Sequence, residues 1–388
     1  MKGSKKEKKG LKKKILAGVL SVVTAAAVVA DVAAFSVYAE QLDKAFPGKE
    51  NNAEEVEEAT KNALTVAEKI EEEGAVLLEN NGALPIQTTK INLLGYAAYN
   101  PVYGGSGSGG SSYLANRTDF AKAFEEAGIE VNPATAEVYK ADATKEENTF
   151  DVDFSIKEVA ATETLAKEMG QDYKYTGEAS FDAMKDYSET AVVVFARKGG
   201  EGNDLPKDMS EYAVTESDKS KHYLELNDAE LSLVERAKAT FNNVIVLINS
   251  GNAMELGFLK NDVEAGSDAT GDIDAALWIG DPGDVGTKAV ASILKGDVNP
   301  SGKLVDIYPY AVETTPSFYN FDTYEYTNSQ ECFENFDSHP AYLLEYQEGI
   351  YVGYRYYETR DSYDYTTLEG ENLTGFTYEQ VVQYPFGY

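Results

Sequence analysis

An uninterrupted apolar run, residues 191–196, contains three consecutive valines. A strand with one face in solvent alternates apolar and polar residues, whereas a strand covered on both faces is apolar throughout. The run therefore predicts an interior strand of a parallel sheet. Residues 244–248 and 275–279 have the same character and predict two further buried strands.

Helical patterns separate these strands. Asn227 and Glu230 have the spacing of a capping box, which predicts a helix over residues 228–241. Strands that alternate with helices of this length require right-handed crossovers, so we expect an α/β fold with a doubly wound, mainly parallel sheet, an α/β sandwich. Functional loops are then expected at the carboxyl ends of the strands. The other expected elements are helices over residues 51–73, 120–127 and 285–294 and a strand over residues 91–95.

The N-terminus has the pattern of an export signal. Eight lysines within the first fourteen residues precede a largely apolar stretch, residues 15–39. As a helix this stretch would reach about 37 Å, enough for a ~30 Å hydrocarbon core. Residues 1–40 are therefore predicted to be a cytoplasmic basic tail and an N-terminal hydrophobic helix that anchors an extracellular domain in the membrane. The alternative is a cleaved signal peptide, which would leave a secreted protein.

Charge and residue usage exclude several classes of partner. The formal net charge of −32 repels phosphate backbones, so no nucleic acid partner is expected. The single cysteine, Cys332, excludes an internal disulfide and a cysteine-based zinc site. His222 and His339 lack ligand spacing, so we expect surface or capping roles for them, with no metal and no cofactor.

A glycine-rich segment, residues 104–110, contains a G-x-G-x-x-G match from Gly105 to Gly110. In dinucleotide-binding proteins this motif forms the turn from a strand directly into a helix. Here nine residues separate the expected strand from the motif, and no clear helix follows. A dinucleotide-dependent enzyme is therefore only a distant alternative.

The loop after residues 191–196 has the residues of a catalytic site. Glu201 lies between glycines, with Arg197 before it and Asp204 after it, at the carboxyl end of a predicted buried strand. Hydrolysis of a glycosidic bond needs a carboxylic acid that protonates the leaving oxygen. We therefore take Glu201 as the candidate acid and Arg197 as its orienting neighbour. The competing interpretation is an ordinary solvated loop.

Tyrosines concentrate near the C-terminus: 16 of the 27 lie from Tyr308 onward. Residues 308–388 are thus a tyrosine-rich extension of the predicted domain. Tyrosine rings either stack on sugars or pack with their hydroxyls at the rim of a core, and packing is the commoner use.

Taken together, these motifs resemble the α/β-sandwich domain of glycoside hydrolase family 3, which contains β-glucosidases and β-xylosidases. The resemblance runs to residue 388, and its motifs lie at residues 73–80, 83–85, 104–109, 197–204, 277–283, 299–309, 348–357 and 384–388.

The resemblance implies that residues 51–388 form this domain and that Glu201 is the general acid/base for retaining hydrolysis of a β-linked saccharide. The residues it implies for substrate binding are Gly105, Ser106, Gly107, Arg197 and Asp204. The nucleophilic Asp of the family belongs to a (β/α)8 barrel, so a separate barrel domain or chain is the expected partner. The domain order then resembles permuted family members, in an apparently truncated and incomplete enzyme. The alternative is a non-catalytic, membrane-tethered carbohydrate-binding module.

Overall fold

A computed structural model describes residues 53–105, 117–140, 176–201, 204–213, 215–260, 273–321, 324–328, 342–360 and 377–388. The chain divides into two units, Met1–Ala63 and Leu64–Tyr388. Within the first unit, only the beginning of helix α2 (Ala53–Gly74) belongs to the described residues. The sheet, the core and the candidate site all belong to the second unit.

The second unit is built on a six-stranded sheet with the strand order β1-β6-β5-β4-β2-β3. All neighbouring strands are parallel except β1, which pairs antiparallel with β6 at one edge. This arrangement confirms the predicted α/β fold with a mainly parallel sheet. The strands are β1 (Val76–Asn80), β2 (Lys90–Leu94), β3 (Glu130–Val131), β4 (Thr190–Arg197), β5 (Asn243–Ser250) and β6 (Ala275–Trp278).

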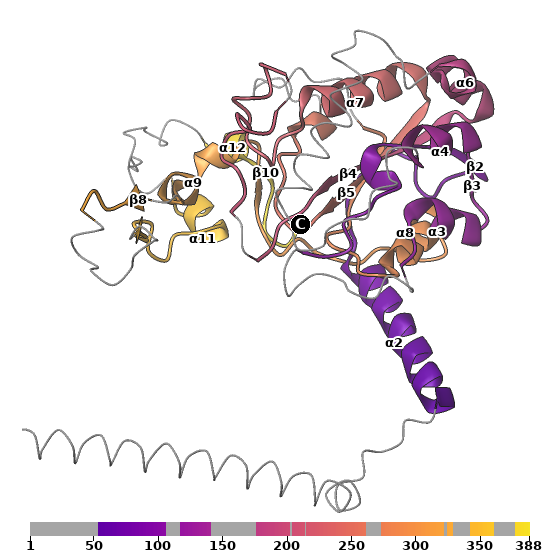
Figure 1. Cartoon of the computed structure of the whole chain (residues 1–388), viewed down its shortest axis with the longest axis horizontal. Coiled ribbons are helices and arrows are strands. Elements are labelled where there is room, and N and C mark those ends of the chain that lie inside the picture. Colours follow the sequence, from indigo (N-terminus) through magenta and orange to yellow (C-terminus); the bar gives the residue numbers. More distant parts are fainter. Residues whose placement is uncertain are drawn as a thin grey trace, which may run out of the picture. The chain divides into compact units, whose positions relative to one another are not determined.

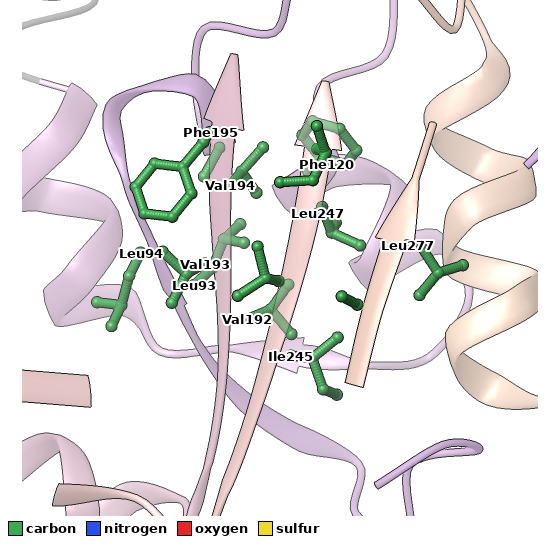
Figure 2. Packing of buried hydrophobic residues seen from close by; sticks show 14 of the residues in the cluster. Leu93, Leu94, Phe120, Val192, Val193, Val194, Phe195, Ile245, Leu247 and Leu277 are labelled. Carbon is green, nitrogen blue, oxygen red and sulfur yellow. The ribbon is translucent and has the colours of Figure 1, made fainter. Parts of the chain in front are cut away.

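Helices cover both faces of this sheet (Figure 1). On one face α6 (Phe181–Tyr187) contacts α7 (Asp228–Thr240), and on the other α3 (Phe120–Glu126) contacts α8 (Gly286–Lys295). Every residue of β4 is buried, as the continuous apolar run predicts. Figure 2 shows aliphatic side chains of β2, β4, β5 and β6 packed together with Phe120 of α3. The core therefore lies between the sheet and both helical layers.

The start of α7 confirms the predicted capping box. The Asn227 side chain accepts a hydrogen bond from the backbone N–H of Glu230 at 2.8 Å, and Glu230 accepts one from the backbone N–H of Asn227 at 2.9 Å. These reciprocal bonds satisfy N–H groups that would otherwise lack a partner at the start of the helix.

The tyrosine-rich extension consists of short elements. Tyr308, Tyr356 and Tyr384 are among its buried tyrosines, whereas Tyr342 and Tyr346 are exposed. The buried rings have the packing role that was the commoner expectation. The remaining elements are α4 (Pro133–Lys140), α9 (Pro316–Asn320), α11 (Tyr354–Tyr357), α12 (Tyr378–Val381), β7 (Tyr308–Pro309), β8 (Tyr324–Glu325), β9 (Tyr342–Leu343), β10 (Val382–Tyr384) and the 3-10 turns η1 (Tyr96–Ala98), η4 (Gly177–Ala179), η5 (Gly257–Leu259) and η7 (Val312–Thr314).

The predicted membrane anchor requires a correction. None of the helices in the described ranges is both long and apolar enough to cross a bilayer. The 22-residue helix α2 has sufficient length, but it contains eight glutamates and two lysines, whose desolvation in hydrocarbon is costly. Residues 1–40, the basis of the prediction, lie outside the described residues. The membrane-anchored, extracellular localisation is therefore withdrawn.

Glu71, near the end of α2, is an unusual buried carboxyl group. It is 9% exposed, and its Oε1 atom has no hydrogen-bond partner among the described residues. Its side chain packs against Gly286, since a Cβ atom on that glycine would lie 3.0 Å from the Glu71 Cγ. Burial, with a contribution from the charge of Asp281, raises the pKa of Glu71 to about 8. The ionised form of Glu71 thus opposes folding.

We expect Glu71→Gln to stabilise the domain at alkaline pH. The folded-state pKa lies above the unfolded value, so the carboxyl costs stability progressively as the pH rises from about 4.5 to 8, and fully above that. At about 1.4 kcal/mol per pKa unit, and allowing for residual solvation, the free energy of unfolding should rise by ~2–3 kcal/mol at alkaline pH. Urea unfolding at mildly acidic and at alkaline pH measures the difference. The exposed neighbour Glu73→Gln is the control, and an equal gain at both pH values would contradict this origin.

Candidate active site

The candidate site lies where the connections between successive strands change direction across the sheet. β2 and β4 are parallel neighbours, but β2 continues through α3 to β3 at one edge, whereas β4 continues through α7 to β5 in the opposite direction. The connections that leave the carboxyl ends of these two strands therefore run in opposite directions. Ligands of open α/β sheets bind at such switch points.

Gly95 allows the backbone that follows β2 to lie in close contact with the backbone of β4. Its φ of 96° lies in the left-handed region, and a Cβ atom there would lie 2.4 Å from the carbonyl oxygen of Val194. A side chain at this position would meet both backbone strain and a collision. Glycine thus lets the chain leave β2 in close contact with Val194 of β4.

Asn249, near the end of β5, joins two loops at the carboxyl end of the sheet. Its side-chain amide exchanges two hydrogen bonds with the backbone of Val102, each at 2.8 Å, and also donates to the carbonyl of Gly280 at 2.8 Å. Asn249 is fully buried, so these bonds form where water cannot compete. The loops after β2 and β6 are therefore held at fixed positions.

Arg197, the last residue of β4, is buried and bound entirely within the protein. Its Nη1 and Nη2 atoms lie 2.8 and 2.7 Å from the two carboxylate oxygens of Glu230, in a bidentate ion pair. Its remaining bonds go to the carbonyls of Ala196, Tyr223 and Glu225. A guanidinium has five N–H donors, and all five are used here. Arg197 is thus committed to contacts within the domain, and the two roles predicted for it, contact with substrate and orientation of Glu201, stay predictions.

The residues between Arg197 and Glu201 are held on three sides. The backbone N–H of Lys198 donates to the Tyr223 hydroxyl at 3.0 Å. A Cβ atom on Gly199 would lie 2.6 Å from the Asn252 amide, and one on Gly105 would lie 3.1 Å from the Gly199 carbonyl oxygen. Residues 198–200 are therefore packed between three other segments.

Glu201 follows in a turn, and its side chain is exposed. Gly105 lies beside this loop, so the structure brings together two of the predicted site residues across nearly a hundred positions of sequence. Asp204 is exposed on the same loop. Ser106 and Gly107 lie outside the described residues.

Asp281, an exposed residue in the loop after β6, adds a carboxyl group to this region. It faces Gly251, where a Cβ atom would lie 2.9 Å from an Asp281 oxygen. Partial desolvation of its carboxyl group raises the pKa of Asp281, and the backbone N–H of Gly251 and the charge of Lys198 act in the opposite direction. Asp281 thus adds an acidic group to the loops that carry the site.

A cavity of about 460 Å³ begins beside this loop. Its lining residues come from three segments of the chain: Gly199, Gly200, Asp204, Leu205, Pro206 and Lys207 from the β4 loop; His222, Leu224 and Asn252 from the adjoining loops; and Val312, Thr315, Ser317, Phe318 and Phe321 from the C-terminal extension.

His222 lies at the wall of this cavity with three carboxylates around it. Its Nε2 atom is 3.0 Å from Glu255, 3.5 Å from Glu225 and 3.9 Å from Glu313. This set has the composition of a metal site, but Nδ1 accepts a hydrogen bond from the backbone N–H of Leu224 at 3.1 Å. A neutral imidazole that accepts at Nδ1 carries its proton on Nε2, where a metal would need the lone pair. The geometry therefore fits a hydrogen bond that His222 donates to Glu255. The predicted surface position of His222 is wrong, because the residue is only 4% exposed.

Several residues that shape the site were missed by the sequence analysis. Glu230 was identified as a helix cap but not as the partner of Arg197. Asn249 had a usable signal, because it is the first polar residue after the apolar run 244–248. No sequence signal distinguishes Asn252 or Asp281 from ordinary loop residues.

Comparison with known proteins places this chain in a family. Residues 75–354 match the family model described as the Glycosyl hydrolase family 3 C-terminal domain. The chain is 28% identical over 334 residues to β-glucosidase A of Butyrivibrio fibrisolvens, covering 81% of this chain and 35% of that protein. It is 27% identical over 304 residues to a β-glucosidase of Ruminococcus albus, covering 76% of this chain and 26% of that protein. The chain thus spans about a quarter to a third of the length of these curated relatives.

Solved structures show the same similarity. β-Glucosidase 3B from Thermotoga neapolitana, in complex with α-D-glucose, superposes with a TM-score of 0.57 at 25% identity, covering 80% of this chain and 38% of that one. A β-glucosidase from Paenibacillus barengoltzii gives the same TM-score and identity, with coverages of 84% and 29%.

Proposed function

This chain belongs to glycosyl hydrolase family 3, and from that premise we propose that it supplies the general acid/base for retaining hydrolysis of β-linked glycosides. Glu201 is the residue to which we assign this role. The observation that supports the assignment is the position of Glu201: an exposed carboxylate on a loop whose preceding residues are fixed at the switch point of the sheet. A catalytic acid needs both an accessible carboxyl and a fixed backbone, because small misplacements reduce the rate.

The proposed reaction has two steps. In the first, Glu201 donates its proton to the glycosidic oxygen while a second carboxylate attacks the anomeric carbon, so that the leaving group departs as an alcohol. In the second, the Glu201 carboxylate removes a proton from water, which attacks the glycosyl ester and releases the sugar and the nucleophile. We assign the second carboxylate to a (β/α)8 barrel domain or chain, as the family resemblance implies. Gly105, beside the Glu201 loop, and Asp204, beyond it, are proposed to contact the sugar.

The test is hydrolysis of an aryl β-glucoside by this chain mixed with the separately produced barrel domain of a family member. We expect turnover from the mixture and none from either component alone, because each component supplies one of the two carboxylates. A mixture containing the heat-unfolded chain is the control. No turnover from two folded components that bind each other would contradict the proposal.

A second candidate function is saccharide binding without catalysis. It is favoured by the exposed tyrosine rings of the C-terminal extension, including Tyr342 at 53% and Tyr346 at 72% exposure. Exposed aromatic rings are suited to stacking against the apolar face of a sugar. Saccharide binding that disappears in Tyr342→Ala and Tyr346→Ala, with no turnover when the barrel is present, would favour this function over the first.

A further inference from the structure

We propose that Tyr223 is the positioning residue for Glu201, because it binds the chain on both sides of Glu201 and so holds the loop that carries it. This inference rests on the proposed function, to which it adds a residue that fixes the acid. Tyr223 is 3% exposed, so it acts through the loop and not by contact with the substrate.

The first contact is made by the Tyr223 hydroxyl group. It accepts a hydrogen bond from the backbone N–H of Lys198, three residues before Glu201, at 3.0 Å. Tyr223 and Lys198 are both 3% exposed, so the bond forms where water does not compete. Burying an N–H or a hydroxyl without a partner is costly, and here each group is the partner of the other. A phenylalanine would fill the same space without this bond, so the hydroxyl is the part of the side chain that fixes Lys198.

The second contact holds the chain beyond Glu201. The backbone N–H of Tyr223 donates to the carbonyl of Pro206, five residues after Glu201, at 3.2 Å. Tyr223 also forms a small apolar cluster with Met209, against which Leu205 packs. One residue therefore binds the chain both before and after the proposed acid. Joining the two sides in this way reduces the number of conformations open to the segment between them.

Tyr223 can hold the loop because it is itself tied to the end of β4. The Arg197 guanidinium lies 5.4 Å from the centroid of the Tyr223 ring, and its Nε atom donates to the Tyr223 carbonyl. Arg197 is in turn paired with Glu230 at the start of α7. The Tyr223 ring thus has a fixed position relative to the sheet and to α7.

The expected consequence is a loss of precision in proton transfer. Without the Tyr223 hydroxyl, the Lys198 N–H loses its partner and the backbone before Glu201 can move. A displacement of about 1 Å in a catalytic group can cost about a hundredfold in rate. Only steps in which Glu201 transfers a proton depend on this placement, so kcat should fall while KM changes little.

The experiment compares Tyr223→Phe with the unaltered full chain in two measurements. In amide hydrogen exchange followed by NMR, protection of the Lys198 amide should fall about tenfold more than that of Val193, within β4, because only Lys198 loses a hydrogen bond. In turnover with the barrel domain of a family member, kcat for methyl β-D-glucoside should fall about 10–100-fold. The first step with 2,4-dinitrophenyl β-D-glucoside, whose leaving group needs no proton, should change much less.

Tyr187→Phe is the control for removal of a tyrosine hydroxyl. This hydroxyl donates to Glu130 at 2.8 Å, and both residues lie near the amino ends of the strands, whereas Glu201 follows a carboxyl end. The control should leave both the Lys198 protection and the turnover unchanged.

Lys198 protection that falls no more than that of Val193 would overturn the inference, because the hydroxyl would then not hold the loop. An unchanged kcat for methyl β-D-glucoside, or an equal loss with both glucosides, would also overturn it. The proposed function fails separately, if the mixture shows no turnover or if Glu201→Gln keeps full activity. In that case the exchange measurement still decides whether Tyr223 holds this loop.

Discussion

Glu201→Gln is expected to lower the turnover of a glycoside with a poor leaving group by about 10²–10⁴-fold, measured in the mixture of this chain with a barrel domain. Glutamine has nearly the same size as glutamic acid but cannot donate a proton to the departing oxygen. The loss should therefore appear in kcat with a smaller change in KM. Methyl β-D-glucoside is a suitable substrate, because its alkoxide leaves very slowly without protonation.

The leaving group provides an internal control for this prediction. A dinitrophenolate departs without protonation, so the first chemical step with 2,4-dinitrophenyl β-D-glucoside should be much less affected by Glu201→Gln. Glu211→Gln, at an exposed glutamate farther along the same loop region, should leave turnover of both substrates unchanged. An equal loss on both substrates in the first step would indicate a structural effect, and the acid role of Glu201 would then be wrong.

Breaking the buried pair of Arg197 and Glu230 is expected to cost about 3–5 kcal/mol of the free energy of unfolding. Both side chains are 3% exposed, so removing one charge leaves the other buried without a counter-ion. Glu230→Gln is the sharper variant, because the glutamine amide oxygen can still accept the capping bond from Asn227 while the charge is lost. Urea unfolding monitored by circular dichroism measures the change.

Two comparisons separate the ion pair from general damage to the fold. The double variant Arg197→Met with Glu230→Leu removes both charges and should cost far less than the sum of the single changes. The exposed pair Lys219–Glu216, 2.6 Å apart, is the surface control, and Glu216→Gln should change stability by less than about 1 kcal/mol. If Glu230→Gln lowered the free energy of unfolding as little as Glu216→Gln does, the stabilising role of the Arg197–Glu230 pair would be contradicted.

Much of the sheet and several helices could be predicted from local sequence alone. Residues 191–196 and 244–248 are short, apolar throughout and rich in β-branched residues, which favours strands covered on both faces. The capping box at Asn227 is a contact between residues three positions apart, so its pattern is visible without any tertiary information. The loop of Glu201 could be placed at the carboxyl edge of the sheet for the same reason, because it directly follows one of these runs.

The sequence by itself therefore determined the α/β class, the positions of the main strands along the chain and the place of the Glu201 loop after one of them, since these depend on patterns within short segments. Only the tertiary structure decided that Arg197 is bound to Glu230, that Asn249 joins two loops, and that Phe318 lines a cavity next to the Glu201 loop. Each of these contacts joins segments tens of residues apart or more. Such a pairing depends on how strands and helices stack in space, and neither periodicity nor spacing along the chain records it.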